Sequence, residues 1–305
     1  MNMSEAAQLS AGGLRGELSL DVDMSRHTSW RAGGVAQRMY RPADLADLQT
    51  YLQQLPQDEP LLAVGLGSNL LVRDGGFRGT VLLLLGALTE LHMQSENLIY
   101  VQAGIPGAKL ARFAAGNNLC GAEFFVGIPG TLGGMLAMNA GCYGSETWQK
   151  VERVQVLTRS GELLERTPNE YEIGYRHVAL RQASEEFFVG AWLRLQQGEV
   201  ESARQAIKLL MEKRSASQPL QQPNAGSVFR NPLGEHAAKL IEGCGLKGQR
   251  IGDAQVSEKH ANFIVNLGNA SATDIERLIG EVRSTVLDKT GFDLQAEVRI
   301  VGDAA

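Results

Sequence analysis

Cysteine is scarce in this chain, with three widely spaced residues among 305. A small odd number of cysteines excludes a disulfide framework and is typical of a reducing compartment. Long apolar runs are missing too. The longest, residues 81–85, has the length of one strand, whereas a membrane-spanning helix needs about 20 apolar residues. Residues 1–16 have neither the basic start nor the apolar core of an export signal, so we expect a cytoplasmic protein that does not enter a membrane.

An excess of positive charge is also missing. The chain carries 29 Lys and Arg against 34 Asp and Glu, a net charge of −5, and it has no basic block. Nucleic acids and anionic membranes are bound by positive patches, so we expect neither as a partner. The histidines show no ligand spacing with cysteine or with each other, and no metal site is predicted.

Glycine, by contrast, is abundant at 35 of 305 residues, about 11% against a usual value near 7%. The glycines follow no collagen period, and two clusters stand out at residues 65–69 and 127–134. Backbone amides in a tight glycine turn can converge on an anion. Neither cluster is followed by the Gly-Lys-Ser/Thr of a Walker A loop, and Leu70 takes the place of the third glycine of the Rossmann fingerprint.

Hydrophobic periodicity predicts a mixed α+β chain. Strands are expected over residues 61–64, 81–85, 99–103, 151–158, 187–195, 263–265 and 294–300. Helices are expected from Pro42, from Pro106 to about 116, and over residues 203–211, 237–242 and 275–286. The last helix is the best supported, because Ser271 and Asp274 are spaced like a capping box before it. Residues 1–22 show no clear pattern, and a boundary near Gly198 separates a glycine-rich half from a smaller α/β half.

Six segments in order resemble the motifs of one enzyme family, from about residue 25 to 302. They are residues 28–34 (TSWRAGG), 65–72 (GLGSNLLV), 127–134 with 139–141 (GIPGTLGG and NAG), 226–232 (GSVFRNP), 260–266 (HANFIVN) and 297–298 (EV). Together they resemble the UDP-N-acetylenolpyruvoylglucosamine reductase (MurB) family. Any one of these motifs is only suggestive, but six in the expected order are highly specific.

The resemblance implies a fold and its ligands. The family has an FAD-binding domain of the vanillyl-alcohol-oxidase (PCMH) type, in two α+β subdomains, and a smaller C-terminal α/β domain for the UDP-sugar. The implied domains are an arm at residues 1–22, the FAD domain at 23–198 with its split near 80, the substrate domain at 199–297, and a terminal strand at 298–305 that returns to the FAD domain. The implied cofactors are non-covalent FAD and NADPH, and the implied state is a monomer or weak oligomer.

The resemblance also implies an activity, the reduction of UDP-N-acetylglucosamine enolpyruvate to UDP-N-acetylmuramate for peptidoglycan. Hydride passes from NADPH through FAD to the vinyl carbon, and a positioned acid then protonates the adjacent carbon. By resemblance Ser227 is that acid, Arg176 neutralises the carboxylate charge, and Glu297 completes the site. Taken alone, each residue favours a structural role: Ser227 as a turn serine, Arg176 as a solvated or structural arginine and Glu297 as a residue on the polar face of a strand. The six ordered motifs reverse that preference.

The remaining site residues follow from the same motifs. The FAD contacts implied are Thr28, Gly65, Gly67, Ser68, Asn69, Gly127, Ile128, Pro129, Gly130, Thr131, Gly133, Gly134, Asn139, Ala140 and Gly141. Substrate contacts are expected from Tyr175, Asn231, Lys259 and His260, although a satisfied core histidine describes His260 as well. Residues 177–186 leave no room for the tyrosine-bearing loop of one family branch, so the chain resembles the other branch, type II.

Two other functions stay open. A flavin oxidase of the same fold would pass electrons to oxygen and would need neither Ser227 nor a nucleotide-sugar site. A non-catalytic nucleotide-sugar sensor would keep the fold and would have lost the flavin or the set of Ser227, Arg176 and Glu297. All three of these residues are present.

Overall fold

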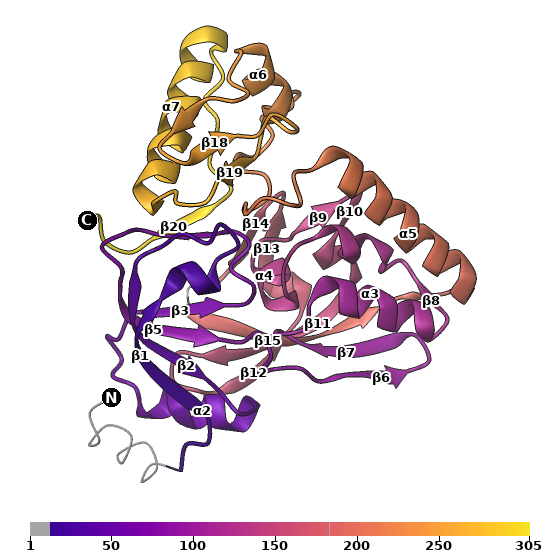
Figure 1. Ribbon diagram of the computed structural model, residues 1–305. Helices are drawn as coiled ribbons and strands as arrows, with labels where there is room; N and C mark the ends of the chain where they lie inside the picture. Colours follow the sequence, from indigo (N-terminus) through magenta and orange to yellow (C-terminus); the bar gives the residue numbers. More distant parts are fainter. Residues whose placement is uncertain (1–12, 183) are drawn as a thin grey trace. The chain divides into compact units, whose positions relative to one another are not determined.

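The computed structural model describes residues 13–182 and 184–305, and the chain divides into two compact units (Figure 1). The first unit comprises the chain up to Leu20, Arg38–Gly65 and Gly79–Lys213, and the second comprises Asp21–Gln37, Leu66–Arg78 and Arg214–Ala305. These units are defined by packing and not by ligands. The predicted assignment of FAD to residues 23–198 and of substrate to residues 199–297 therefore stays a prediction.

A five-stranded antiparallel sheet forms the larger part of the first unit (Figure 1). Its order is β12 (Leu163–Arg166), β11 (Val151–Thr158), β15 (Glu186–Arg194), β7 (Leu98–Gln102) and β6 (Leu91–Ser95). Helices α3 (Gly107–Gly116) and α4 (Leu132–Ala137) and the 3₁₀ turn η2 (Glu123–Gly127) pack against one face. Strand residues Val101, Val154 and Ala191 meet Leu110 and Leu132 in that core.

The helix predicted from Pro106 is confirmed, since Pro106 is the N-cap and Asn117 the C-cap of α3. Proline has no backbone N–H to donate, so a helix start accommodates it. The strand predicted over residues 151–158 is confirmed as β11, and those predicted over 99–103 and 187–195 are confirmed within one residue as β7 and β15.

A four-stranded sheet has the order β1 (Glu17–Asp23), β2 (Val35–Arg41), β5 (Phe77–Leu83) and β3 (Leu61–Val64). The division between the units falls within β1, β2 and β5. Helix α2 (Leu45–Gln54) buries Leu48 and Leu52 in the same core as Leu82. The predicted unpatterned arm needs correction: residues 1–12 lie outside the described chain, but residues 17–23 are a strand.

Shorter elements complete the first unit. These are β8 (Leu119–Cys120) paired with β16 (Gln196–Gln197), β9 (Gly141–Cys142) paired with β10 (Ser145–Glu146), the 3₁₀ turns η3 (Thr147–Lys150) and η4 (Pro168–Glu170), and the hairpin β13 (Tyr171–Gly174) with β14 (His177–Leu180). Helix α5 (Val200–Ser217) contains the helix predicted over 203–211 and buries Ala203 and Ile207. The hairpin β13–β14 was not predicted from the sequence.

The second unit packs α6 (Ala237–Gly243) and α7 (Ala272–Thr290) with the sheet β17 (Arg250–Ile251), β18 (Ala254–Val256) and β19 (Ile264–Asn266). It also contains η1 (Met24–His27) and β4 (Leu70–Val72), which pairs in parallel with β20 (Arg299–Val301). Trp30 is fully buried in this core, and its indole N–H donates to Ile264 O at 2.7 Å.

The final strand is shorter than the predicted 294–300. Glu297 N donates to Val228 O at 2.7 Å, whereas Arg299 N donates to Asn69 O at 3.0 Å. The segment therefore changes its hydrogen-bonding partner between residues 297 and 299, and only Arg299–Val301 forms a regular strand. Alternation of apolar residues indicates which face of a strand is buried, but it does not indicate which segment the backbone pairs with.

The N-terminus of α7 has the predicted capping box, with Ser271 as N-cap and Asp274 at the third helical position. Asp74 adds a second carboxylate there, accepting from Ala272 N at 3.0 Å, Thr273 N at 2.8 Å and Thr273 Oγ1 at 2.6 Å. Burial raises the pKa of Asp74, but the Thr273 and Ala272 hydrogen bonds outweigh it and the net pKa is lowered. Asp74 thus stabilises the folded unit in its ionised form.

We expect Asp74→Asn to lower the free energy of unfolding by about 1–2 kcal/mol at neutral pH, because the amide keeps one acceptor oxygen and loses the charge at the helix N-terminus. A lowered folded-state pKa gives stability that is present above the unfolded pKa and lost as pH falls through the folded value. Urea unfolding measured from neutral to acid pH should therefore show that the free energy of unfolding falls less in the variant than in the unchanged protein. Asp288→Asn, at an exposed position late in the same helix, is the control; an equal effect there would contradict the capping role.

None of the helices in the described parts of the chain is long and apolar enough to cross a membrane. Of the three cysteines, Cys244 is buried and Cys120 and Cys142 are partly buried, and all three are free thiols.

Candidate functional site

The first glycine loop is held at two points where only glycine fits. A Cβ on Gly65 would lie 2.1 Å from Thr131 Oγ1, so this loop approaches the second glycine loop closely. Gly67 has φ +62°, and a Cβ there would lie 2.0 Å from His27 O. A side chain at either position would need the backbone or Thr131 to move.

The N-terminal motif lies against the same loop within the second unit. Ser29 N donates to Gly67 O at 3.0 Å, and the buried Thr28 hydroxyl donates to Ala32 O at 2.8 Å. Within residues 13–182 and 184–305, the N–H groups of Leu66, Gly67 and Ser68 have no hydrogen-bond acceptor. Consecutive free amides in a glycine turn can bind an anion.

The second glycine loop is anchored on the sheet of the first unit. Leu132 N donates to Ile105 O and Gly133 N to Ala103 O, each at 2.9 Å, and Gly107 N donates to Gly130 O at 3.1 Å. A Cβ on Gly133 would lie 3.0 Å from Ala103 Cβ, whereas a Cβ on Gly134 would meet no atom within 4 Å. The loop therefore has a packed side at Gly133 and an open side at Gly134.

Arg176 occupies the two-residue turn of the β13–β14 hairpin, in which Gly174 pairs with His177. It has φ +54°, a conformation that few residues other than glycine adopt, and its Nη2 donates to Gly141 O at 2.9 Å. The side chain of Asn139 is buried and bonds to Gly174 O at 3.0 Å. The structure thus brings together predicted residues from the segment 139–141 and from the turn 175–176.

In the second unit the structure brings together Ser227, Glu297 and Asn69. Ser227 precedes Val228, whose carbonyl accepts from Glu297 N at 2.7 Å, and Asn69 Nδ2 donates to Glu297 O at 3.1 Å. The loop before Ser227 turns at Gly226, which has φ +74° and whose N–H donates to Asn224 Oδ1 at 3.0 Å. Arg176 belongs to the first unit.

The predicted substrate contacts have different surroundings. Asn231 Oδ1 accepts from Ala237 N at 3.1 Å, at the start of α6, and Lys259 Nζ donates to Ser215 O at 2.7 Å. His260 stands edge-on to Phe263, and its buried Nδ1 has no hydrogen-bond partner within the described chain. His260 is therefore not a satisfied core histidine. Burial lowers the pKa of this imidazole, which favours the neutral form.

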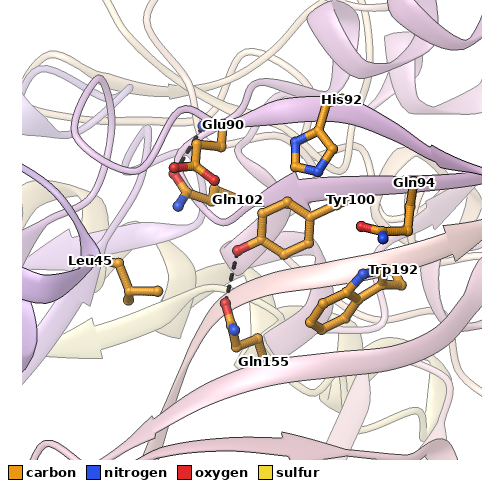
Figure 2. A pocket seen from close by; sticks show the side chains of 8 residues that line it. All are labelled: Leu45, Glu90, His92, Gln94, Tyr100, Gln102, Gln155 and Trp192. Atoms are coloured by element: carbon orange, nitrogen blue, oxygen red, sulfur yellow. Dashed lines mark hydrogen bonds between the residues drawn. The ribbon is translucent and has the colours of Figure 1, made fainter.

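The first unit has an open pocket of about 330 Å³. Figure 2 shows the side chains that line it: Leu45, Glu90, His92, Gln94, Tyr100, Gln102, Gln155 and Trp192. Tyr100 OH donates to Gln155 Oε1 at 2.8 Å, and Glu90 N donates to Gln102 Oε1 at 2.9 Å. Its aromatic residues Tyr100 and Trp192 cluster with Leu98, separately from the core under α3 and α4. None of the predicted site residues lines this cavity.

Sequence reasoning missed Asn262, which holds the Ser227 loop. Its Oδ1 accepts from Phe229 N at 3.0 Å, its Nδ2 donates to Phe229 O at 2.8 Å, and its backbone O accepts from Val228 N at 2.9 Å. The only signal was a polar residue inside the apolar stretch 261–265. In the part of the chain that the structure describes, no group of three His, Cys, Asp or Glu residues could hold a metal ion.

Comparison with known proteins shows which family the chain belongs to. Residues 218–301 match the C-terminal domain of UDP-N-acetylenolpyruvoylglucosamine reductase, and residues 36–167 match an FAD binding domain. The UDP-N-acetylenolpyruvoylglucosamine reductase of Thiobacillus denitrificans is 55% identical over 316 residues, which cover 99% of this chain and 98% of its own. The chain belongs to the UDP-N-acetylenolpyruvoylglucosamine reductase family.

Two further comparisons agree with this membership. The enzyme of the same name from Nitrosomonas eutropha is 56% identical over 298 residues, covering 95% of this chain and 90% of its own. The crystal structure of the reductase (MurB) from Thermus caldophilus has a TM-score of 0.79 and 31% identity, covering 94% of this chain and 99% of that one. The predicted family and the predicted mixed α/β fold, with an FAD-binding and a C-terminal domain, are confirmed.

The residues present fit a dinucleotide cofactor. The first loop offers free N–H groups at Leu66, Gly67 and Ser68, and the second loop has open space over Gly134. Both features suit close approach of a pyrophosphate to backbone, which a side chain would prevent. Gly65, which packs against Thr131 Oγ1, belongs to the first unit, whereas residues 66–69 belong to the second.

Proposed function

We propose that this chain catalyses the NADPH-dependent, FAD-mediated reduction of UDP-N-acetylglucosamine enolpyruvate to UDP-N-acetylmuramate, a step of peptidoglycan precursor synthesis. The observation that carries this proposal is family membership over nearly the whole chain. Ser227, Arg176 and Glu297, the catalytic residues that the resemblance implies, are all present in the sequence. We assign the chain to the type II branch, because only residues 181–185 separate β14 from β15 in the sequence.

FAD, when bound, supplies the hydride transfer, taking hydride from NADPH and delivering it to the vinyl carbon of the substrate. The two glycine loops would hold its pyrophosphate through backbone N–H groups. Arg176 would bind the substrate carboxylate, where negative charge increases as hydride arrives, and a fixed cation lowers that barrier. One of its nitrogens is held by Gly141 O, which fixes the orientation of the guanidinium plane.

Ser227 would then donate a proton to the carbon next to the vinyl carbon. Serine is a weak acid, so its hydroxyl must be placed accurately and its alkoxide supported. The loop supplies accuracy, because Gly226 is fixed by Asn224 and both Val228 and Phe229 are fixed by Asn262. Glu297, on the neighbouring segment, would stabilise the intermediate or hold it in place. Asn231, Tyr175, Lys259 and His260 are proposed to bind the substrate.

The visible spectrum during turnover tests this function. Purified protein should show flavin absorbance that NADPH bleaches and that the enolpyruvyl UDP-sugar restores without oxygen. Recovery by oxygen alone would support a flavin oxidase instead. Protein that FAD cannot reconstitute would support the non-catalytic sensor.

The open space over Gly134 gives a second test. Gly134→Ala should leave the apo-protein as stable or up to about 1 kcal/mol more stable, because alanine favours a helix. It should weaken FAD binding by about tenfold or more, because the new methyl group occupies the space proposed for the pyrophosphate. Gly280→Ala in α7 is a matched control, since that glycine is also exposed, helical and without neighbours within 4 Å. Unchanged FAD affinity in Gly134→Ala would contradict the assignment of this loop.

We further propose a cytoplasmic location without nucleic-acid or membrane partners. The free thiols suit a reducing compartment, and NADPH and nucleotide sugars are made in the cytoplasm. We also propose that the chain acts as a monomer or weak oligomer.

A further inference from the structure

The side chain of Asn139 makes all its donor hydrogen bonds within the protein. Its Nδ2 donates to Glu146 Oε2 at 2.9 Å and to Gly174 O at 3.0 Å, while its Oδ1 accepts from Trp148 N at 3.1 Å. A primary amide has two N–H donors, so none is left for a ligand. The residue is only 2% exposed, and leaving one of these groups unpaired would be costly.

Two hydrogen bonds link the segment 139–141 to the turn that carries Arg176. Gly174 is the last residue of β13 before the turn, and its carbonyl accepts from Asn139. The guanidinium of Arg176 donates to Gly141 O, two residues after Asn139. The segment 139–141 therefore holds the turn at two points: the Asn139 side chain binds the main chain at Gly174, and Gly141 O accepts from the Arg176 side chain.

Asn139 is itself held in an unusual conformation. Its φ is +41°, which asparagine tolerates better than most residues. Glu146 is the N-cap of η3 and forms a capping box with Gln149. The capping box orients the carboxylate that accepts from Asn139. The backbone N–H of Trp148 donates to Asn139 Oδ1, and the Trp148 ring lies 5.0 Å from the ring of Tyr171, the first residue of β13.

We infer that Asn139, oriented by Glu146, is a positioning residue that fixes the turn carrying Arg176 and so aims its guanidinium. The inference deepens the proposed function and rests on the role proposed there for Arg176. This role differs from the FAD contact predicted for Asn139 from the sequence. Because the side chain is used within the protein, only the backbone of Asn139 would remain to contact FAD.

Asn139→Asp isolates the donors. Aspartate has the same shape and tolerates positive φ, but it loses both N–H groups and faces the Glu146 carboxylate. Asn139→Gly keeps the backbone conformation without any side chain. Glu146→Gln keeps an acceptor oxygen for Asn139 and is the conservative control, which should behave like the unchanged protein. Glu146→Ala removes that oxygen and tests the same link if an Asn139 variant folds poorly.

The first readout is amide hydrogen exchange in the apo-protein. Asn139→Asp, Asn139→Gly and Glu146→Ala should exchange faster across residues 171–180, and Glu146→Gln should not. The second readout is the pair of half-reactions. FAD affinity and flavin reduction by NADPH should change less than about threefold, while reoxidation by the enolpyruvyl UDP-sugar should slow by about tenfold or more.

A double-mutant cycle with Arg176→Ala decides whether Asn139 acts through Arg176. If it does, adding Asn139→Asp to Arg176→Ala should slow reoxidation by no more than about twofold. Full additivity, or a loss confined to FAD affinity, would overturn the inference. If Arg176→Ala turns over normally, the proposed role of Arg176 fails, while unchanged hydrogen exchange at 171–180 would separately overturn the positioning of the turn.

Discussion

Replacing Ser227 with alanine is expected to leave flavin reduction by NADPH unchanged and to slow reoxidation by the enolpyruvyl UDP-sugar by about 10²–10⁴-fold, the usual contribution of a general acid. The two half-reactions differ in one requirement. Hydride transfer from NADPH needs no proton from the protein, whereas completion of the substrate reduction needs one at carbon. Anaerobic stopped-flow absorbance separates the two rates.

The geometry around Ser227 makes this variant informative. Hydrogen bonds to Asn224 and Asn262 hold the loop through backbone and asparagine groups, none of which involves the Ser227 hydroxyl. Alanine should therefore leave the loop in place and remove only the hydroxyl. Ser160→Ala, at an exposed turn of the first unit, is the control and should leave both rates unchanged. Equal slowing of both half-reactions by Ser227→Ala would remove Ser227 from the acid role.

Local sequence signals predicted the regular elements well. α7 was predicted because its apolar period and its Ser271–Asp274 box agree; in the structure the helix ends at Gly291, which has φ +78°. The elements missed or misjudged include β1, the edge strands β6 and β12, the β13–β14 hairpin and the end of the last strand. In each of these the deciding information is the strand it pairs with, which local periodicity does not contain.

In the candidate site, too, some residues could be predicted from the sequence and others could not. The identities of Ser227, Arg176 and Glu297 came from motif resemblance, and the residues that hold them did not. Asn262 bonds to Phe229 across 33 positions, and Asn139 bonds to Gly174 across 35. Contacts at such separation depend on the tertiary fold, so no spacing rule within one motif predicts them.

Arg176→Lys is expected to reduce turnover by about 10²–10³-fold, comparable with the loss of one donor that stabilises a developing oxyanion. The guanidinium donates to Gly141 O from Nη2, and its five N–H groups form a planar fork whose geometry matches a carboxylate. A lysine ammonium is one point charge on a flexible stem and cannot hold both in a fixed plane. The backbone contributes little to the difference, because lysine and arginine meet the same strain at φ +54°.

The control is Arg181→Lys, which follows β14 of the same hairpin and donates to Asn169 O from an exposed position. It should leave turnover unchanged, which separates the loss of a guanidinium in general from its loss at the turn. If Arg176 stabilises charge that develops during hydride arrival, Arg176→Lys should lower kcat and kcat/KM together, whereas a purely substrate-binding role would raise KM and spare kcat. Near-normal turnover in Arg176→Lys would contradict both roles and would leave the strained turn without a catalytic explanation.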